Sequence, residues 1–129
     1  MTAGAALQAA IVGLFTGMEG LAGIYDGPPA RAEYPYLVVD CGTETDWSCA
    51  SHRGREVTLQ LIVWDDQPAR LAELEERFET SLSPKIDVTG WGMVTLHLRE
   101  KKRLRQPGAP GNCSFRFRTR LLQSGGGAT

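Results

Sequence analysis

The chain has 129 residues, of which 22% are charged, and its 14 basic and 15 acidic residues give a formal net charge of −1. This length predicts one domain with a single core, and the near balance of charge argues against a general nucleic-acid or membrane binder. The apolar runs are shorter than the ~20 residues that span a bilayer, and the odd number of cysteines, three, excludes complete pairing within the chain.

The first predicted element is a helix over about residues 3–19, with an apolar stripe of Leu7, Ile11, Leu14 and Met18 (plus Ala10). The following segment, "GIYDGPPARAEYPY", contains three prolines and two glycines and predicts an irregular connector. A short apolar strand is expected over residues 36–41. The polar residues 42–54 then predict a long, mobile loop.

The second strand and second helix meet in "LQLIVWDDQPARLAELEERFETSL". Alternating apolar residues from Val57 to Val63 predict a strand with one buried face. The period then changes, and the spacing of Leu71, Leu74, Phe78 and Leu82 predicts a helix.

Asp65 and Asp66 separate these two patterns. A metal or acid/base site is one interpretation, but carboxylate metal sites need further oxygen ligands, and the sequence has no second acidic cluster. We therefore expect the pair to cap the start of the helix, with the proline in its first turn.

Two more strands are predicted, over residues 91–100 and 113–122, with a polar loop at residues 101–112 between them. In the first, alternation places Trp91, Met93, Thr95 and His97 on one face and Val94, Leu96 and Leu98 on the other. In the second, it separates the apolar residues from Arg116, Arg118 and Arg120.

The element order is α-β-β-α-β-β. It predicts an α+β fold with a largely antiparallel four-stranded sheet, two helices packed on one face, and long polar loops. We expect a single domain over residues 1–129, with a core at about 3–121 and a flexible tail at 122–129.

The sequence carries no signature of an active site. Cys41, Cys49 and His52 lie close together, but their C-x7-C-x2-H spacing matches no common zinc motif and lacks a fourth ligand. We predict no catalytic, metal-binding or cofactor-binding residues, and no enzymatic activity.

More than half of the positive charge lies in the last third of the chain. It is concentrated in Arg99, Lys101, Lys102, Arg103 and Arg105 and on the arginine face of residues 116–120. One interpretation is a surface for an anionic partner, either DNA phosphate or an acidic protein. The other is a solvated edge whose charges prevent aggregation of sheets.

The layout resembles the tail completion proteins, or tail terminators, of long-tailed phages. The resemblance covers roughly residues 5–121. It rests on the first helix, "YPYLVVD", the polar loop, "LQLIVWDD", the helix "ARLAELEERFETSL" and the closing strands. The short, Ala- and Arg-rich character is similar to versions from prophages and gene transfer agents. These motifs are patterns of residue types rather than catalytic signatures.

The resemblance implies a structural virion protein made in the bacterial cytoplasm. It implies a homo-oligomeric ring, typically a hexamer, that caps the tail tube and joins it to the head-side connector, or stopper, protein. DNA would pass through without sequence-specific binding. The alternatives are a nucleic-acid-binding adaptor that uses the basic C-terminal third, or another head–tail connector component.

The two long loops, residues 42–54 and 100–111, are the regions that the resemblance assigns to contacts between rings. Trp64 lies beside Ile62 on the strand face opposite Leu61 and Val63, which indicates burial by a helix, a loop or a neighbouring subunit. The predicted interaction residues are Trp47, His52, Arg53, Trp64, Lys101, Lys102, Arg103, Arg105, Arg116, Arg118 and Arg120.

Overall fold

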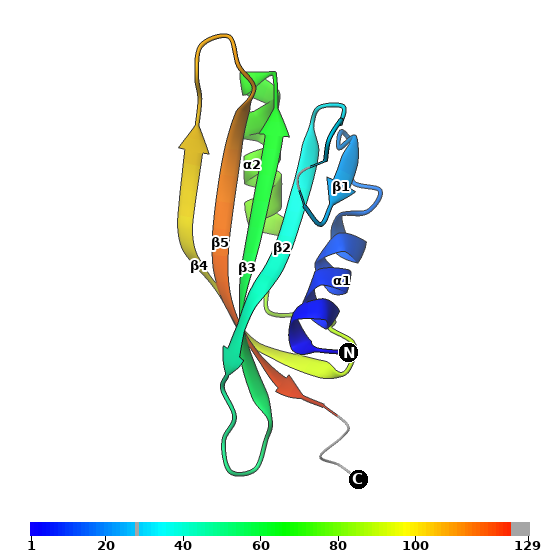
Figure 1. The fold of residues 1–129 in the computed structure, drawn as a ribbon, viewed down its shortest axis with the longest axis vertical. Coiled ribbons are helices and arrows are strands. Elements are labelled where there is room, and N and C mark those ends of the chain that lie inside the picture. The colour runs from blue at the N-terminus through cyan, green and yellow to red at the C-terminus, as the bar shows by residue number, and fades with distance from the viewer. Residues whose placement is uncertain (28, 125–129) are drawn as a thin grey trace.

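The computed structural model describes residues 1–27 and 29–124 as one long, strongly twisted sheet with two helices beside it (Figure 1). The elements are α1 (Ala3–Phe15), β1 (Gly23–Tyr25), β2 (Tyr36–Asp46), β3 (Gly54–Asp65), α2 (Pro68–Ser81), β4 (Trp91–Leu104) and β5 (Gly111–Gln123). The predicted α+β class is confirmed. The predicted tail at 122–129 is wrong at its start, since Leu122 and Gln123 belong to β5; residues 125–129 lie outside the described residues.

The sheet has five strands in the order β1-β2-β3-β5-β4, not the four that were predicted. It is mixed, because β1 pairs with β2 in parallel while all the other pairs are antiparallel. β1 has only three residues and lies in the segment where the sequence predicts an irregular connector. Three residues show no period, so this strand is defined by its pairing partner rather than by its own sequence.

The core lies between the sheet and the helices. Leu59, Leu61 and Val63 of β3 are fully buried, as their alternation predicts. Phe15 of α1 meets Phe78 of α2 edge-on, with ring centroids 4.8 Å apart. The predicted stripe of α1 was wrong at its end, because Phe15 is buried whereas Leu14 is 43% exposed. The helix stops at Phe15, so Met18 lies beyond it.

β4 departs from simple alternation at two irregularities in its register with β5. One lies between Met93 and Thr95 and the other between Leu98 and Glu100. Each inserts one extra residue, which moves every later side chain to the other face. The predicted faces of this strand are therefore wrong beyond Met93. Leu96 lies against the core, whereas Thr95 lies opposite Arg120 on the other side.

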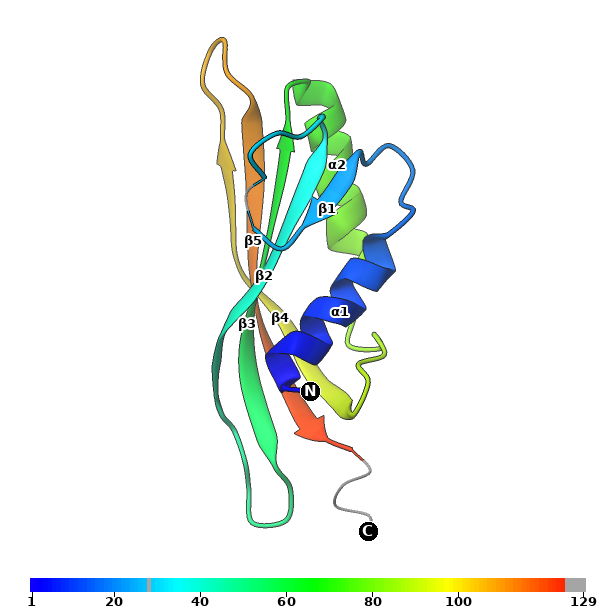
Figure 2. The same cartoon turned by 45° about the vertical axis from the view of Figure 1, so that its right-hand side comes forward.

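The two predicted long loops are shorter than expected. β2 continues to Asp46 and β4 to Leu104, so the connections are only residues 47–53 and 105–110. Polar residues fill the added strand positions, and a polar segment is not distinguishable from a loop by composition alone. The two hairpin ends lie at opposite ends of the long axis in both views (Figures 1 and 2).

Candidate interaction surfaces

The β2–β3 hairpin end, residues 47–53, carries three of the predicted interaction residues. Trp47 lies under the Arg120 guanidinium, with Arg120 Cζ 5.1 Å from the ring centroid. His52 and Arg53 are exposed. Two backbone hydrogen bonds close this hairpin end, from Trp47 N to Gly54 O (2.9 Å) and from Cys49 N to His52 O (2.9 Å), while its mobility stays a prediction. Backbone bonds of this kind fix the shape of the tip.

Gly54 is required at the base of this hairpin end. A Cβ atom there would lie 2.4 Å from the carbonyl oxygen of Trp47, which no real side chain tolerates. The Gly54 amide instead donates to Ser48 Oγ at 3.0 Å. The hairpin end is therefore a defined surface rather than an unstructured loop.

The predicted basic loop, residues 100–111, separates into two groups with different surroundings. Lys101 and Arg103 lie on the helix side of β4 and hold Glu75, which is 2% exposed. Lys101 Nζ lies 2.6 Å from Glu75 Oε1, and Arg103 donates through two of its nitrogens. Lys102 and Arg105 are exposed. The role of Glu75 could not be predicted from the sequence, because its partners belong to a strand more than 20 residues away in the chain.

The cluster of Glu75, Lys101 and Arg103 strongly favours the ionised form of the Glu75 carboxyl group. Hydrogen bonding by Arg103, and then by Lys101, outweighs the effect of burial and lowers the pKa of Glu75 from 4.5 to about 2. This ionised carboxylate ties α2 to the outer strand of the sheet. Lys101 and Arg103 therefore have a role within the subunit, whatever else they contact.

Asp65 and Asp66 do not form the expected helix cap. The N-cap position of α2 is Gln67, which makes no side-chain cap. Asp65 is instead buried and accepts two hydrogen bonds of 2.7 Å from Arg70, as well as one from Gln67 N at 3.1 Å. Burial raises the pKa of Asp65, but these hydrogen bonds outweigh it and hold the pKa below its usual value.

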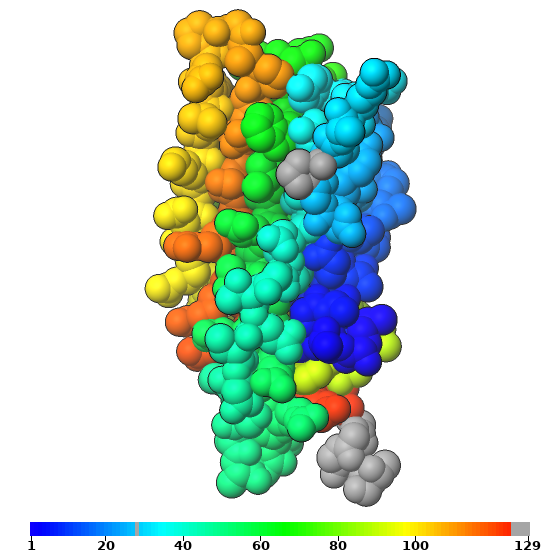
Figure 3. Space-filling model, viewed as in Figure 1, coloured from blue at the N-terminus to red at the C-terminus, as the bar shows by residue number. Residues whose placement is uncertain are grey.

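One face of the sheet carries no helix. α2 lies behind β3 and β5 in Figure 1. Figure 3, in the same view, shows that no helix covers the near side of these strands. We call this uncovered side the open face. Its basic half consists of Arg99, Arg116, Arg118 and Arg120, with Glu56 and Glu100 among them. The predicted arginine face thus lies outside the core.

The carboxylates of the open face hold the arginines unevenly. Arg120 Nε bonds to Glu56 Oε1 at 3.0 Å, whereas Arg118 Nε is 3.7 Å from the same oxygen. Arg116 is 3.9 Å from Glu100. A hollow of about 200 Å³ lies beside them, lined by Glu56, Thr58, Arg99, Arg116, Phe117 and Arg118. Its guanidinium groups suit a carboxylate or a phosphate.

The other half of the open face is aromatic. Trp64 stacks on Tyr36 with ring centroids 6.4 Å apart and an interplanar angle of 18°. Tyr34 also stacks on Tyr36, with ring centroids 5.7 Å apart, and Tyr25 meets Tyr36 edge-on. Trp64 lies opposite the buried face of β3, as predicted, and remains half-buried. The tyrosines were missed because no local period links them.

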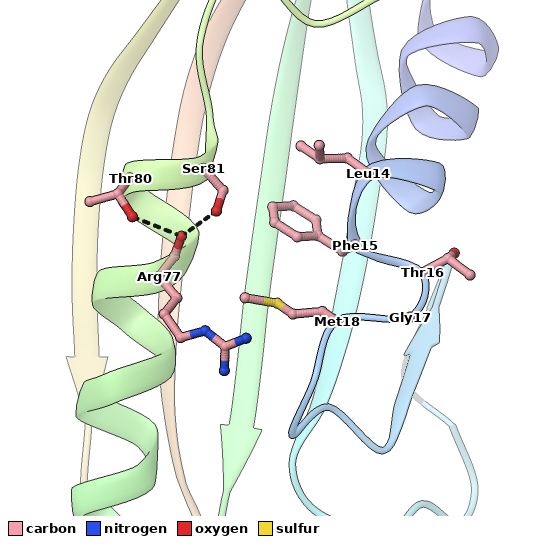
Figure 4. A pocket seen from close by; sticks show the side chains of 8 residues that line it. All are labelled: Leu14, Phe15, Thr16, Gly17, Met18, Arg77, Thr80 and Ser81. Carbon is pink, nitrogen blue, oxygen red and sulfur yellow. Dashed lines mark hydrogen bonds between the residues drawn. The ribbon is translucent and has the colours of Figure 1, made fainter.

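No catalytic arrangement was found among the described residues. A hollow of about 340 Å³ at the ends of the helices is lined by Leu14, Phe15, Thr16, Gly17, Met18, Arg77, Thr80 and Ser81 (Figure 4). Arg77 is its one charged group, and its Nη1 donates to the backbone oxygen of Glu19 at 2.9 Å. A lone, occupied guanidinium supplies neither an acid/base pair nor a nucleophile.

The cysteines and the helices give no further site in the part of the chain described. Burial raises the pKa of the Cys41 and Cys113 thiols to about 12, whereas Cys49 is exposed at the hairpin end. No group of three possible metal ligands occurs among residues 1–27 and 29–124. Within the same ranges, neither helix is long and apolar enough to cross a membrane.

The chain is similar in fold to a solved virion structure and matches one protein-family model. A solved structure described as "Virion of native gene transfer agent (GTA) particle" shares the fold with a TM-score of 0.65 and 19% identity, covering 88% of this chain and 85% of that one. The comparison with curated proteins gave no match. The family described as "Tail completion protein gp17" matches residues 2–121. The chain therefore belongs to the tail completion protein gp17 family and is a structural protein of a phage-type virion tail.

Proposed function

We propose that the protein is the subunit of a tail terminator ring, with six copies to a ring. The ring caps the tail tube, stops its growth and joins it to the head-side connector protein, and DNA passes through it without sequence-specific binding. Family membership and the likeness in fold to a chain of a gene transfer agent virion support this proposal.

The observation that carries the proposal is the placement of the two hairpin ends. Residues 47–53 and 105–110 project from opposite ends of the long axis (Figure 1). A joining subunit needs one surface for the tube and a different one for the head. The two ends also differ in chemistry, since one carries Trp47 and His52 and the other carries Arg105 and two prolines.

A terminator is needed because a tube of stacked identical rings has no intrinsic end. A heterologous head-to-tail interface repeats without closing. A ring that presents two unlike ends can bind the last tube ring and offer nothing to a further one. The absence of a catalytic arrangement among the described residues is consistent with such an architectural role.

A nucleic-acid adaptor is the competing function, and the open face argues against it. Glu56 and Glu100 lie among the arginines and pair with Arg120 and Arg116. Pairing with these carboxylates leaves too little net positive charge on this face for a long run of phosphates. We expect the isolated protein to bind duplex DNA weakly; tight binding with a steep dependence on salt would favour the adaptor instead.

Deletion of the gene tests the proposal directly. We expect heads without joined tails, together with tubes of uncontrolled length, in electron micrographs of lysates. Complementation with the wild-type gene is the control. Normal numbers of tailed particles with normal tail length in the deletion strain would rule out the terminator role.

The hairpin ends can be tested without disturbing the core. Replacing residues 49–52 by Asn-Gly shortens one end, and Lys102→Gln/Arg105→Gln neutralises the exposed cations at the other. Both variants should fold, as checked by circular dichroism, because neither change touches a buried residue. Joined particles should fall at least ~10-fold, since each end contacts a different ring. The exposed pair Arg31→Gln/Lys85→Gln, away from both ends, is the matched control.

A further inference from the structure

The outer side of α2 carries charge of the opposite sign to the open face. Leu71, Leu74 and Phe78 point into the core. The helical period therefore places Ala69, Glu73, Glu76 and Thr80 on the ridge that points away from the sheet. Glu73 and Glu76 are exposed, and neither lies within 4.0 Å of a cation among the described residues.

The basic half of the open face has unused donors. Arg116 and Arg118 reach their nearest carboxylates only at 3.9 and 3.7 Å, both longer than a hydrogen bond. Arg99 lies in the same hollow and has no carboxylate within salt-bridge distance in the described part of the chain. Three guanidinium groups thus surround a space that contains one glutamate, Glu56.

The two charged surfaces also match in spacing and in direction. Alternate residues on a strand, such as Arg116 and Arg118, lie about 7 Å apart. Residues three apart on a helix, such as Glu73 and Glu76, lie about 5–6 Å apart. The α2 ridge and the open face lie on opposite sides of the sheet, so they cannot meet within one subunit (Figures 1 and 2).

We propose that the outer ridge of α2 from one copy of the chain docks on the basic half of the open face of the next copy. Glu73 and Glu76 enter the hollow formed by Arg99, Arg116 and Arg118. The interface uses two different surfaces, so it is heterologous, and an interface of this kind forms a ring when the rotation between neighbouring copies closes. Ala69 is small and lets the helix approach closely. This inference rests on the proposed ring, and it names the contact that builds the ring.

Charge reversal on each side gives a test with a built-in rescue. The face variant is Arg99→Glu/Arg116→Glu, and the ridge variant is Glu73→Arg/Glu76→Arg; all four positions are exposed. Each variant alone places like charges against each other and should weaken self-association at least ~10-fold. An equimolar mixture restores opposite charges at every contact, so it should recover to within ~3-fold and give only even-numbered rings.

Self-association is measured by sedimentation velocity and native mass spectrometry at about 50 and about 500 mM salt, because an ionic interface weakens with screening. Joined particles are counted in the deletion strain complemented with either variant or with both. Arg31→Glu/Lys85→Glu and Asp26→Lys/Asp87→Lys are matched charge reversals elsewhere and should stay within ~3-fold of wild type. Arg99→Gln/Arg116→Gln serves as the face variant if the reversal does not fold.

Several results would overturn this interface. One is a face or ridge variant that assembles like wild type. Another is a mixture of the face and ridge variants that gives no more joined particles than either variant alone, in a deletion strain that the wild-type gene restores. Loss with the face variant but not the ridge variant would point to DNA or another acidic protein. Normal tails in the deletion strain would exclude the terminator function. Sedimentation velocity would still test the contact between copies in that case.

Discussion

Two buried carboxylates, Asp65 and Glu75, fix the position of α2. They are 1% and 2% exposed, and each is held by cations that stay partly in solvent. Asp65 binds Arg70 within the first turn of the helix, whereas Glu75 binds Lys101 and Arg103 of β4. A buried carboxylate is stable only while it is paired, so these contacts are specific requirements of the fold.

The two adjacent aspartates should therefore differ in their effect on stability. Asp65→Ala removes a buried acceptor of three hydrogen bonds and should lower the free energy of unfolding by about 2 kcal/mol. Asp66 is exposed, and its contact with Arg70 is 3.4 Å, so Asp66→Ala should cost less than ~0.5 kcal/mol. Urea denaturation of both variants measures the difference. Equal losses would contradict the difference between a buried, paired Asp65 and an exposed Asp66.

Glu75 should give the protein a distinct loss of stability in acid. Its pKa falls from 4.5 to about 2 on folding, so the unfolded chain binds more protons between these values. The stabilisation is complete above about pH 4.5 and is lost as the pH falls towards 2. It should amount to about 2 kcal/mol, after allowance for solvent around the half-exposed Arg103.

The variant Glu75→Gln isolates this contribution. It should be less stable than wild type at pH 7, and its unfolding free energy should vary less between pH 4.5 and 2. Glu79→Gln is the matched control, because Glu79 is exposed and shares only Lys101. Parallel curves for wild type and Glu75→Gln would contradict the assigned pKa shift.

Among the elements, β4 shows where local sequence reasoning ends. α2, β3 and β5 were predicted because the periods of their apolar residues are local and unbroken. β4 has two extra residues, so its faces depend on its register with β5. The extension to Leu104 was missed for a related reason. Its polar side chains are ordered by β5 and by Glu75, neither of which is adjacent in sequence.

Deletion of single residues from β4 should reveal the extra residue between Met93 and Thr95. Removing Val94, which is 45% exposed, leaves Met93 and Thr95 opposite consecutive residues of β5 and keeps the later faces. Removing Leu96 instead moves His97 to the core side. We expect ΔVal94 to remain folded and ΔLeu96 to lose at least ~2 kcal/mol, measured by thermal and urea unfolding. A more damaging deletion of Val94 would contradict this register.

At the scale of the whole molecule, the class of fold and the family follow from sequence patterns, whereas the surfaces do not. The arginine alternation of β5 correctly placed Arg116, Arg118 and Arg120 outside the core. The sequence could not show that Lys101 and Arg103 are paired with Glu75, or that Tyr36 and Trp64 lie side by side. Such neighbours are set by strand order, and the strand order β3-β5-β4 brings distant segments together.

The pairing of β3 with β5 has a mechanical consequence. The two strands run in unbroken register from Gly54↔Leu122 at one end of the molecule to Asp65↔Gly111 at the other. At about 3.4 Å per residue, this ladder is roughly 40 Å long. A pulling force on the two hairpin ends acts along these strands and loads all their hydrogen bonds in shear at once. The subunit should therefore resist stretching along its long axis. Its length sets the gap between whatever the ends hold. Taking two residues from each strand would shorten that gap by about 7 Å and leave every side chain on its own face.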